Sequence, residues 1–388
     1  MESKIKKVLV YSHSTEDTTG IDDEMYAYLK DEGVEQVTLV QFPFTFSKKG
    51  AIRITRTFKG KESRSESAIK FYKPEPISYI KDMVYGLYYG FRFGWGADFL
   101  FASNNLLAIV GIMLRGLGVV RRVGYNLIDF TPVRYQNPIL NAVYNAVDRF
   151  AAYHADHVFP LNKEMIMGRV DSGLFDLSKI RWSPMPFGNN SNRYSESDFD
   201  QGDPKKLVFF GGLIKSKGVE LLVPIMEELK RLGRNDLSLV CIGGGEVDWL
   251  KAEVKKAGLE KVFDIRGRIS DHHEVERILL TCGVALAPYN PHDENSFSRY
   301  ADVGKVKVYL GCALPVIITD VPPVAKVLEK QKAGLVSEYD AKDIAARIIE
   351  ITAKDLEYRQ YRKQAKKLGK DFAWPTIFSR AITTLVNE

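Results

Sequence analysis

Glycine and basic residues gather directly after short apolar runs in the second half of the chain. These residues are Gly211, Gly212, Lys217, Gly243, Gly244 and Arg268. Glycine lets the backbone approach a ligand closely, and successive backbone N–H groups can cradle an anion. Each loop alone is explained nearly as well by a simple turn between a strand and a helix. A single phosphate-bearing ligand site on one rim of a sheet explains all of them together.

The stretch 300–323 completes this predicted site. A helical run at 305–312 is followed at once by an apolar strand at 316–318, which is half of an αβ unit of a parallel sheet. Asp302 and Lys305 flank the start of the helix, where free N–H groups favour anions. We expect the polar residues around this helix start to bind the ligand, namely Ser298, Tyr300, Asp302 and Lys305.

Asp129 is the best chemical candidate in the first half. It comes just after the apolar run 119–127, and a carboxylate at such a strand end could act as a general base. Asp129 could instead cap a helix or bind a backbone N–H group. His13 and Arg134 are lesser candidates on the same side, for contacts to an acceptor.

The segment 48–93 is rich in basic and aromatic residues. From Lys48 to Asp82 it carries ten basic residues and four acidic ones. For residues 48–73, with Lys59 and Lys61, we favour an interfacial surface that places basic groups against anionic lipid headgroups. For residues 79–93 we expect a helix packed on the sheet, with its aromatic rings mostly in the core. A nucleic-acid surface is a weaker interpretation, because no recognised module accompanies the patch.

The elements that must position these residues alternate between strand and helix along both halves of the 388-residue chain. This predicts an α/β protein with two Rossmann-like domains, at 1–187 and 205–372. The polar, turn-rich stretch 188–204 reads as a linker. Residues 340–368 are expected to form one amphipathic helical run, and residues 373–388 a last helix.

Composition and motifs exclude several classes. The net charge of +6 is too small to indicate nucleic-acid binding. No zinc-binding pattern, G-x-S-x-G or P-loop is present, so we expect no metal site. Residues 1–7 are charged and the apolar run 106–114 is too short to span a bilayer, so we expect neither signal peptide nor membrane span. Three separated cysteines in apolar contexts indicate reduced core thiols in a cytoplasmic protein, Cys241, Cys282 and Cys312.

With these residues assembled, the chain resembles GT-B fold glycosyltransferases, as a divergent member of the family-4-like group (glycosyl transferases group 1). Residues 210–218 look like that group's F-x-G-R-L-x-x-x-K-G, in which the Arg and Lys hold the donor diphosphate. Lys217 matches the lysine, whereas Gly212 stands in place of the arginine. The group's E-x7-E pattern falls on Tyr300 and Val308, and the stretch instead looks like divergent members with Asp-x-x-Lys, matched by Asp302 and Lys305.

The resemblance implies two Rossmann-like domains that face each other across a cleft, with the C-terminal helix crossing back to the first domain. It implies a hexosyl-type transfer from a nucleotide-diphosphate sugar, bound by the second domain, to an acceptor hydroxyl. No cofactor or metal would be needed, because lysines and helix N-termini would offset the leaving-group charge. Asp129 falls where such enzymes place a catalytic or acceptor-orienting group, and a base role for it would lead to inversion.

Four functions stay open from the sequence. The leading one is a membrane-surface transferase that builds a lipid-linked or envelope glycan, peripheral on the inner face of the cell membrane. The others are a GT-B transferase with a soluble acceptor, a nucleotide-sugar epimerase on the same fold, and a non-catalytic nucleotide-sugar-binding scaffold. The scaffold is suggested by three departures from the group's pattern, Gly212, Tyr300 and Val308.

Overall fold

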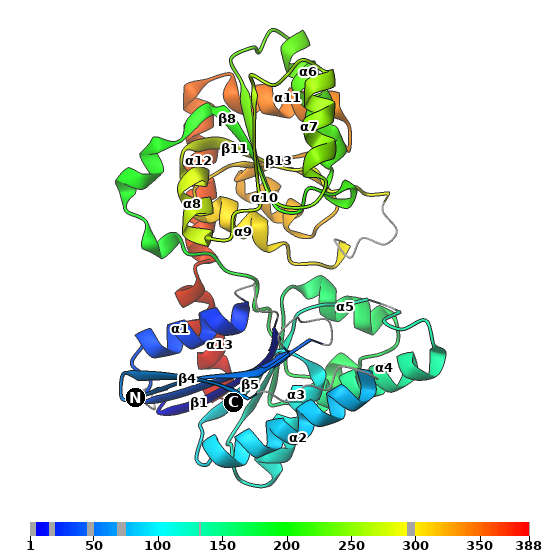
Figure 1. Cartoon of the computed structure of the whole chain (residues 1–388), viewed down its shortest axis with the longest axis vertical. Coiled ribbons are helices and arrows are strands. Elements are labelled where there is room, and N and C mark those ends of the chain that lie inside the picture. Colours follow the sequence, from blue (N-terminus) through cyan, green and yellow to red (C-terminus); the bar gives the residue numbers. More distant parts are fainter. Residues whose placement is uncertain are drawn as a thin grey trace. The chain divides into compact units, whose positions relative to one another are not determined.

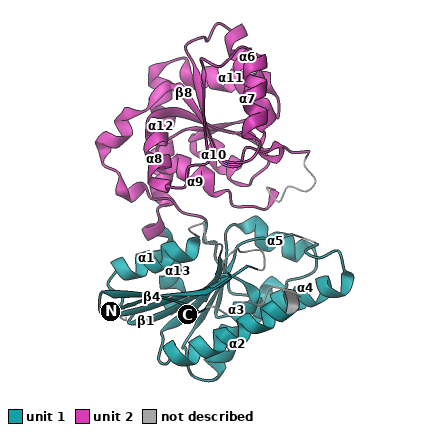
Figure 2. Ribbon diagram, viewed as in Figure 1, with its two compact units in different colours: residues 1–186, 377–388 teal, residues 187–376 magenta. Residues whose placement is uncertain are grey.

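The computed structural model of the protein describes residues 5–14, 20–44, 50–67, 75–131, 133–292 and 299–387. The chain divides into two compact units (Figure 2): unit 1 holds residues 1–186 and 377–388, and unit 2 holds residues 187–376. Residues 188–204, expected as a linker, lie within unit 2. Three of their side chains are buried there, those of Asn189, Ser191 and Phe199.

Unit 1 is built on one seven-stranded sheet. Its strands are β1 (Lys7–Ser14), β2 (Gln36–Pro43), β3 (Ile52–Phe58), β4 (Lys61–Ser67), β5 (Phe99–Ala102), β6 (Val123–Leu127) and β7 (His157–Pro160). They lie in the order β4-β3-β2-β1-β5-β6-β7; β3 pairs antiparallel with both β2 and β4, and all other pairs are parallel. The chain moves outward from β1 in both directions. The sheet therefore has a topological switch point between β1 and β5, where ligands of open α/β sheets usually bind.

Helices cover both faces of this sheet (Figure 1). They are α1 (Ile21–Asp31), α2 (Glu75–Phe93), α3 (Asn105–Gly116), α4 (Pro138–His154), α5 (Lys163–Asp171) and the end of α13 (Trp374–Asn387). Helices α2, α3 and α4 pack side by side on one face. On the other face, the ring of Tyr28 in α1 lies 5.6 Å from that of Phe378 in α13. The expected return of the last helix to the first domain is thus confirmed.

The β3–β4 hairpin is an element that the sequence analysis missed. Its two turn residues, Lys59 and Gly60, have φ values of 49° and 78°. A two-residue turn with both residues left-handed matches the twist of a hairpin, and the glycine at the second position adopts this conformation without strain. The side chains of β4 are nearly all exposed and alternate in charge. The described part of residues 48–73 is therefore an edge hairpin, and residues 68–74 lie outside the described residues.

Unit 2 contains a six-stranded parallel sheet in the order β10-β9-β8-β11-β12-β13. Its strands are β8 (Asp203–Phe210), β9 (Ser238–Ile242), β10 (Phe263–Gly267), β11 (Cys282–Ala287), β12 (Val316–Thr319) and β13 (Gly334–Ser337). Most are short apolar runs, because parallel strands are covered on both faces. The switch point of this sheet lies between β8 and β11.

Two features of the helices of unit 2 were not expected from the sequence, the break within the run 340–368 and the helix at 324–331. The helices are α6 (Leu222–Arg231), α7 (Val247–Lys256), α8 (His272–Leu280), α9 (Gly304–Gly311), α10 (Val324–Gln331), α11 (Ala341–Thr352) and α12 (Asp355–Asp371). The single expected run is two helices, separated at Ala353 and Lys354. Because α11 packs on α6 whereas α12 packs on α9, the two need different directions. Neither residue at the break is glycine or proline, so no local breaker predicts it.

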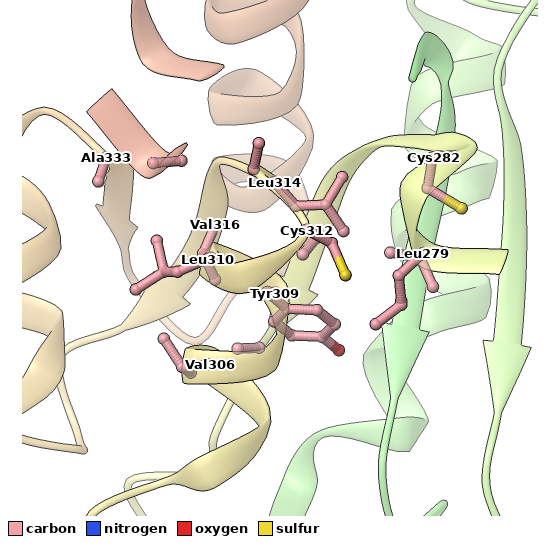
Figure 3. Close-up of a cluster of buried hydrophobic side chains, with 14 of the residues drawn as sticks. Leu279, Cys282, Val306, Tyr309, Leu310, Cys312, Leu314, Val316 and Ala333 are labelled. Atoms are coloured by element: carbon pink, nitrogen blue, oxygen red, sulfur yellow. The ribbon is translucent and has the colours of Figure 1, made fainter. Parts of the chain in front are cut away.

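Helix α9 is anchored in the core of unit 2 through one face. Figure 3 shows Val306, Tyr309 and Leu310 of this helix among buried side chains that include Leu279, Cys282 and Val316. The three cysteines of the chain are buried and free, which confirms that they are core thiols. A helix held this firmly fixes the direction of the side chains at its start.

Candidate functional site

The candidate site of unit 2 lies where β8, β9 and β11 end. Gly211 follows β8 with φ of 130°, and its N–H donates to the carbonyl of Ile242 at 2.9 Å. Gly243 follows β9, and a Cβ atom there would lie 1.7 Å from the carbonyl oxygen of Gly211. Only glycine fits this position, because the two loops are in direct backbone contact.

The loop after β8 is also locked to the loop after β11. Gly218 has φ of 78°, and a Cβ atom on it would lie 1.9 Å from the carbonyl oxygen of Pro288. The N–H of Asn290 donates to the carbonyl of Ser216 at 3.3 Å. The glycines thus bring both sides of the switch point together as one rigid rim.

Lys305, at the start of α9, extends under this rim. Its stem lies against Gly211, where a Cβ atom would be 3.1 Å from Lys305 Cδ. Its Nζ lies 4.7 Å from the ring centroids of both Phe209 and Tyr289. The Nζ atom is buried and has no hydrogen-bond partner among the described residues. Lys217 approaches the same Tyr289 ring, with its Nζ 4.8 Å from the centroid.

The electrostatics of this pair of lysines favour an anion. Burial, and secondly the charge of Lys217, lower the pKa of Lys305 to about 7. A buried ammonium without a hydrogen-bonded counter-charge is costly, so an anion bound between the two lysines would stabilise the charged form. The free N–H groups at the start of α9 also favour an anion. The first turn of this helix carries no acidic residue, and its N-cap, Val303, has no capping side chain.

The hydroxyl of Tyr309, in α9, binds the backbone at the end of β8. Its hydroxyl accepts a hydrogen bond from the N–H of Phe210 at 2.6 Å and lies 3.2 Å from the carbonyl oxygen of the same residue. Burial raises the pKa of Tyr309, so its hydroxyl keeps its proton at neutral pH. This contact fixes the strand end from which the glycine loop starts.

Asp302, which the sequence placed beside Lys305 in the site, is engaged elsewhere in unit 2. Its Oδ1 lies 2.7 Å from Nζ of Lys307, and its Oδ2 accepts from the N–H of Phe187 at 2.6 Å. Both side chains of this ion pair are almost fully buried. The geometry therefore gives Asp302 a structural contact and leaves Lys305 as the ligand-binding candidate of this helix start.

The remaining predicted residues of unit 2 are spread along the rim. A Cβ atom on Gly244 would lie 3.6 Å from Cβ of Arg268, which is exposed after β10, and Gly212 is exposed beside Gly211. Tyr300 is half-buried ahead of α9, and Ser298 lies outside the described residues. Sequence reasoning missed two residues, Phe209 and Tyr289. Their signal was an aromatic residue at or just beyond each strand end of the switch point.

In unit 1, Asp129 and Arg134 form one ion pair after β6. Nη1 of Arg134 lies 2.6 Å from Oδ2 of Asp129, and the Asp129 side chain is 52% exposed. The carbonyl of Asp129 accepts from Arg169, whose guanidinium is buried against Asp148. The buried Arg169–Asp148 pair fixes the loop, while the carboxylate of Asp129 stays open to a substrate.

The side chain of His13, in contrast, is buried and has hydrogen-bond partners. Its ring is 5% exposed, and its Nε2 lies 3.0 Å from Oδ2 of Asp82 in α2. Its Nδ1 contacts the side-chain amide of Asn104, which caps α3. His13 therefore joins β1, α2 and α3. Asp82 and Asn104 are partners that the sequence analysis did not find.

Asp22 adds a second buried acid near the switch point of unit 1. Burial raises its pKa to about 7, but it accepts a hydrogen bond from the hydroxyl of Ser103, next to β5. Lys59 and Lys61, expected on the acceptor or membrane side, lie at the β3–β4 turn. Because Phe58 pairs with Gln36, the first residue of β2, this turn is at the edge of the sheet opposite to His13.

Unit 1 also has a surface cavity of about 450 Å³ between α1 and the β3–β4 hairpin. Its lining is mainly polar and includes planar amide, carboxylate and guanidinium groups, which can bind sugar hydroxyls. Its lining residues include Asp23, Tyr26, Gln41, Arg53, Glu62 and Arg64. Arg53 donates to Ser14 at the end of β1 at 2.6 Å, so the cavity reaches the carboxyl edge of the sheet.

Comparisons with known proteins agree with this architecture. Residues 191–368 match the sequence model of the family described as glycosyl transferases group 1. No curated protein sequence matches the chain.

Solved structures match nearly the whole chain. HepE from Anabaena in complex with UDP aligns with a TM-score of 0.68 at 13% identity, covering 98% of this chain and 100% of that one. Sucrose-phosphate synthase from Thermosynechococcus elongatus aligns with a TM-score of 0.69 at 16% identity, covering 97% and 98%. WaaG, a glycosyltransferase involved in lipopolysaccharide biosynthesis, aligns with 0.61 at 12%, covering 98% and 99%.

The protein therefore has the GT-B fold of glycosyltransferases, as the sequence predicted. The match to the glycosyl transferases group 1 model spans nearly the whole of its unit 2. Within the described residues, no helix is long and apolar enough to cross a membrane, and no cluster of three or more potential metal ligands occurs.

Proposed function

We propose that this protein transfers a sugar from a nucleotide-diphosphate sugar, bound at the rim of unit 2, to an acceptor hydroxyl. The observation that carries the proposal is the buried ammonium of Lys305 at the β8/β11 switch point, which has no hydrogen-bond partner among the described residues. A diphosphate would supply the missing counter-charge, with Lys217 beside it. The structural neighbour HepE was solved with UDP and with UDP-glucose, which makes these the first ligands to test.

The same lysines would assist the chemistry. As the bond between the sugar and the diphosphate breaks, negative charge grows on the leaving phosphate oxygen, and positive groups fixed beside it stabilise that charge. Binding of the anion would raise the pKa of Lys305 from its value of about 7, so that the lysine is charged when the bond breaks.

Asp129 is our candidate for the general base. The acceptor hydroxyl would give its proton to this carboxylate while its oxygen attacks the anomeric carbon and the nucleoside diphosphate leaves. Direct attack of this kind inverts the anomeric centre. The Arg134 ion pair would have to open or turn, which is feasible because both side chains are about half exposed.

We propose a lipid-linked or envelope glycan as acceptor, used at the inner face of the cell membrane. Two observations support this: WaaG, a structural neighbour, is involved in lipopolysaccharide biosynthesis, and helices α2, α3 and α4 of unit 1 carry exposed apolar side chains. The polar cavity between α1 and the β3–β4 hairpin would suit the sugar part of such an acceptor.

A thermal-shift screen of nucleoside diphosphates and their sugars tests the donor site. A ligand that binds only the folded protein raises its melting temperature, by an amount that grows with its concentration. We expect a shift from at least one nucleoside diphosphate that is lost in Lys305→Ala. No shift from the whole panel would contradict the proposal. Donor consumption that needs no acceptor would instead indicate the epimerase.

A further inference from the structure

Helix α2 of unit 1 turns its small and polar residues toward the protein. Gly86 and Gly90 allow close packing, since a Cβ atom on them would lie 3.1 Å from Val110 and 2.2 Å from Leu114 of α3. The buried residues of α2 follow one another at helical spacing and are Ser78, Asp82, Gly86, Tyr89 and Gly90. Of the described large hydrophobic side chains of α2, only that of Tyr89 is fully buried.

The outward face of α2 is apolar instead. Its exposed large residues, with the tryptophan just beyond the helix end, are 40–62% exposed and comprise Ile77, Ile80, Val84, Tyr88, Phe91 and Trp95. They recur every three or four residues, so they form a single stripe along the helix. A helix on a water-exposed surface normally places polar residues there. The expectation that the aromatic rings of this helix lie mostly in the core was therefore wrong for Tyr88 and Phe91.

Three cations adjoin the aromatic end of this stripe. The guanidinium carbons of Arg56 and Arg92 lie 4.2 and 5.3 Å from the ring centroid of Phe93, and Lys7 donates to the carbonyl of Trp95 at 3.0 Å. None of the three is ion-paired with a carboxylate among the described residues. Burial, and secondly the charge of Arg92, lower the pKa of Arg56; burial, and secondly the charge of Arg56, lower that of Lys7. The side chains of Arg56 and Lys7 thus each have a neighbouring positive charge and no carboxylate in an ion pair among the described residues.

The neighbouring helices extend the apolar surface. On α4, Ile139, Val143 and Phe150 are 74%, 55% and 44% exposed, and Met113 and Leu117 are exposed at the end of α3. Because α2, α3 and α4 pack side by side, this whole helical layer carries exposed apolar side chains (Figure 1). A surface of this kind marks an interaction site.

We infer that the α2 face of unit 1, from Ile77 to Trp95 with its cluster of Lys7, Arg56 and Arg92, docks on an anionic lipid bilayer. Aliphatic side chains would enter the acyl boundary, the aromatic rings would lie at headgroup level, and the cations would meet lipid phosphates. A second copy of this chain fits less well, since the same face of that copy would bring another set of unpaired cations. The inference moves the expected membrane contact from residues 48–73 to α2.

The inference rests on the proposed function for its membrane-bound acceptor, but its test needs neither donor nor acceptor. The full-length protein is sedimented with vesicles of phosphatidylcholine alone or mixed equally with phosphatidylglycerol. We expect the double variant Ile80→Glu, Val84→Glu to lose at least tenfold in partitioning to the mixed vesicles. For the double variant Arg56→Gln, Arg92→Gln, we expect partitioning to the anionic vesicles to fall about fivefold for each residue replaced. Partitioning to phosphatidylcholine vesicles should not change, and high salt should reduce the difference from wild type on the anionic vesicles.

Matched controls lie on α12 of unit 2. Leu356 is 71% exposed and Arg359 is exposed beside Asp355, so Leu356→Glu and Arg359→Gln make the same chemical changes away from α2. Both should bind vesicles like the wild type, and all variants should keep the wild-type melting temperature. Failure of the wild type to bind anionic vesicles, or unchanged binding by the α2 variants, would overturn the inference. So would a wild-type dimer that light scattering shows to dissociate in Ile80→Glu, Val84→Glu.

Discussion

The carboxyl edges of the two sheets differ in how their charges are satisfied. Both sheets are doubly wound, with a switch point between β1 and β5 in unit 1 and between β8 and β11 in unit 2. Near the first, His13 is paired with Asp82, and Asp22 accepts a hydrogen bond from Ser103. At the second, the buried ammonium of Lys305 has no such partner among the described residues. The difference indicates that unit 2, rather than unit 1, is prepared for an anion.

Two lysines of α9 show the same contrast at short range. Lys307 lies 2.7 Å from Asp302 in a buried ion pair, whereas Lys305, two residues earlier, faces two aromatic rings and Lys217. Residues two apart on a helix point in different directions, so one can be structural and the other free for a ligand. A buried, perturbed group of this kind at a strand end is a typical sign of a functional site.

The largest expected effect concerns the edge of unit 1, which holds the candidate base. Asp129→Asn should keep donor binding and lose transfer by about 10²–10⁴-fold, because an amide cannot accept the acceptor proton. Sugar transfer and donor thermal shift are measured on the same preparation. Arg134→Gln serves as control, since it removes the ion-pair partner but keeps the carboxylate. Sugar transfer by Asp129→Asn at the wild-type rate would contradict the role of Asp129 as general base.

Replacing each of the two lysines of α9 in turn separates an effect on protein stability from an effect on ligand binding. Lys307→Met should lower the free energy of unfolding by about 3 kcal/mol, because it leaves the Asp302 carboxylate buried without its partner. The affinity of this variant for a nucleoside diphosphate should equal that of the wild type. Lys305→Ala should weaken that affinity more than tenfold, about 1.4 kcal/mol or more. Denaturant melts and calorimetry report the two quantities. Equal affinity of Lys305→Ala and wild type would end the assignment of the site.

Without ligand, the unpaired lysine should destabilise the protein in a pH-dependent way. Its folded-state pKa of about 7 lies below the ordinary lysine pKa of 10.5, so between these two values the unfolded state binds more protons and stability rises with pH. Lys305→Met should therefore be more stable than wild type by roughly 5 kcal/mol at pH 6, with the gap closing toward pH 10. Denaturant melts across this range check it. A gap that does not vary with pH would mean that Lys305 does not titrate in this way.

The smallest effect is expected at Gly212, where the group's pattern has an arginine. A Cβ atom at Gly212 would meet only Ile214, at 3.7 Å and beyond, so a side chain fits without strain. Gly212→Arg should tighten nucleoside-diphosphate binding about threefold by adding a cation at the exposed rim, where screening keeps the gain small. Gly212→Gln is the neutral control in the same titration. Tighter binding by both variants would exclude charge as the cause.

Much of the fold followed from the sequence, because parallel strands buried on both faces appear as short apolar runs. The expected strand 316–318 is one residue shorter than β12 (Val316–Thr319), and the expected helical run 305–312 is shifted by one residue from α9 (Gly304–Gly311). The β3–β4 hairpin was missed because its polar residues alternate in an exposed edge strand, where apolar periodicity gives no signal. The break between α11 and α12 depends on packing against two different helices, which local sequence does not encode.

The candidate site was predicted in part. Glycines that must touch another backbone, Gly211 and Gly243, were found because only glycine fits there. The role of Asp302 could not be foreseen, because its partners are the N–H of Phe187, distant in sequence, and the side chain of Lys307. Burial of His13 and exposure of the α2 stripe likewise depend on tertiary packing. Spacing places a residue on a helix face but does not show what covers that face.

Proton uptake on ligand binding tests the central claim about Lys305 most directly. Calorimetric titration of a nucleoside diphosphate at pH 8, in two buffers of different ionisation enthalpy, gives the number of protons taken up. At this pH Lys305 is mostly neutral without ligand, so the wild type should take up a large fraction of one proton when the anion restores its charge. Lys305→Met, titrated at higher ligand concentration, should show no such uptake. Equal proton uptake by the two proteins would contradict the claim that the lysine is completed by the diphosphate.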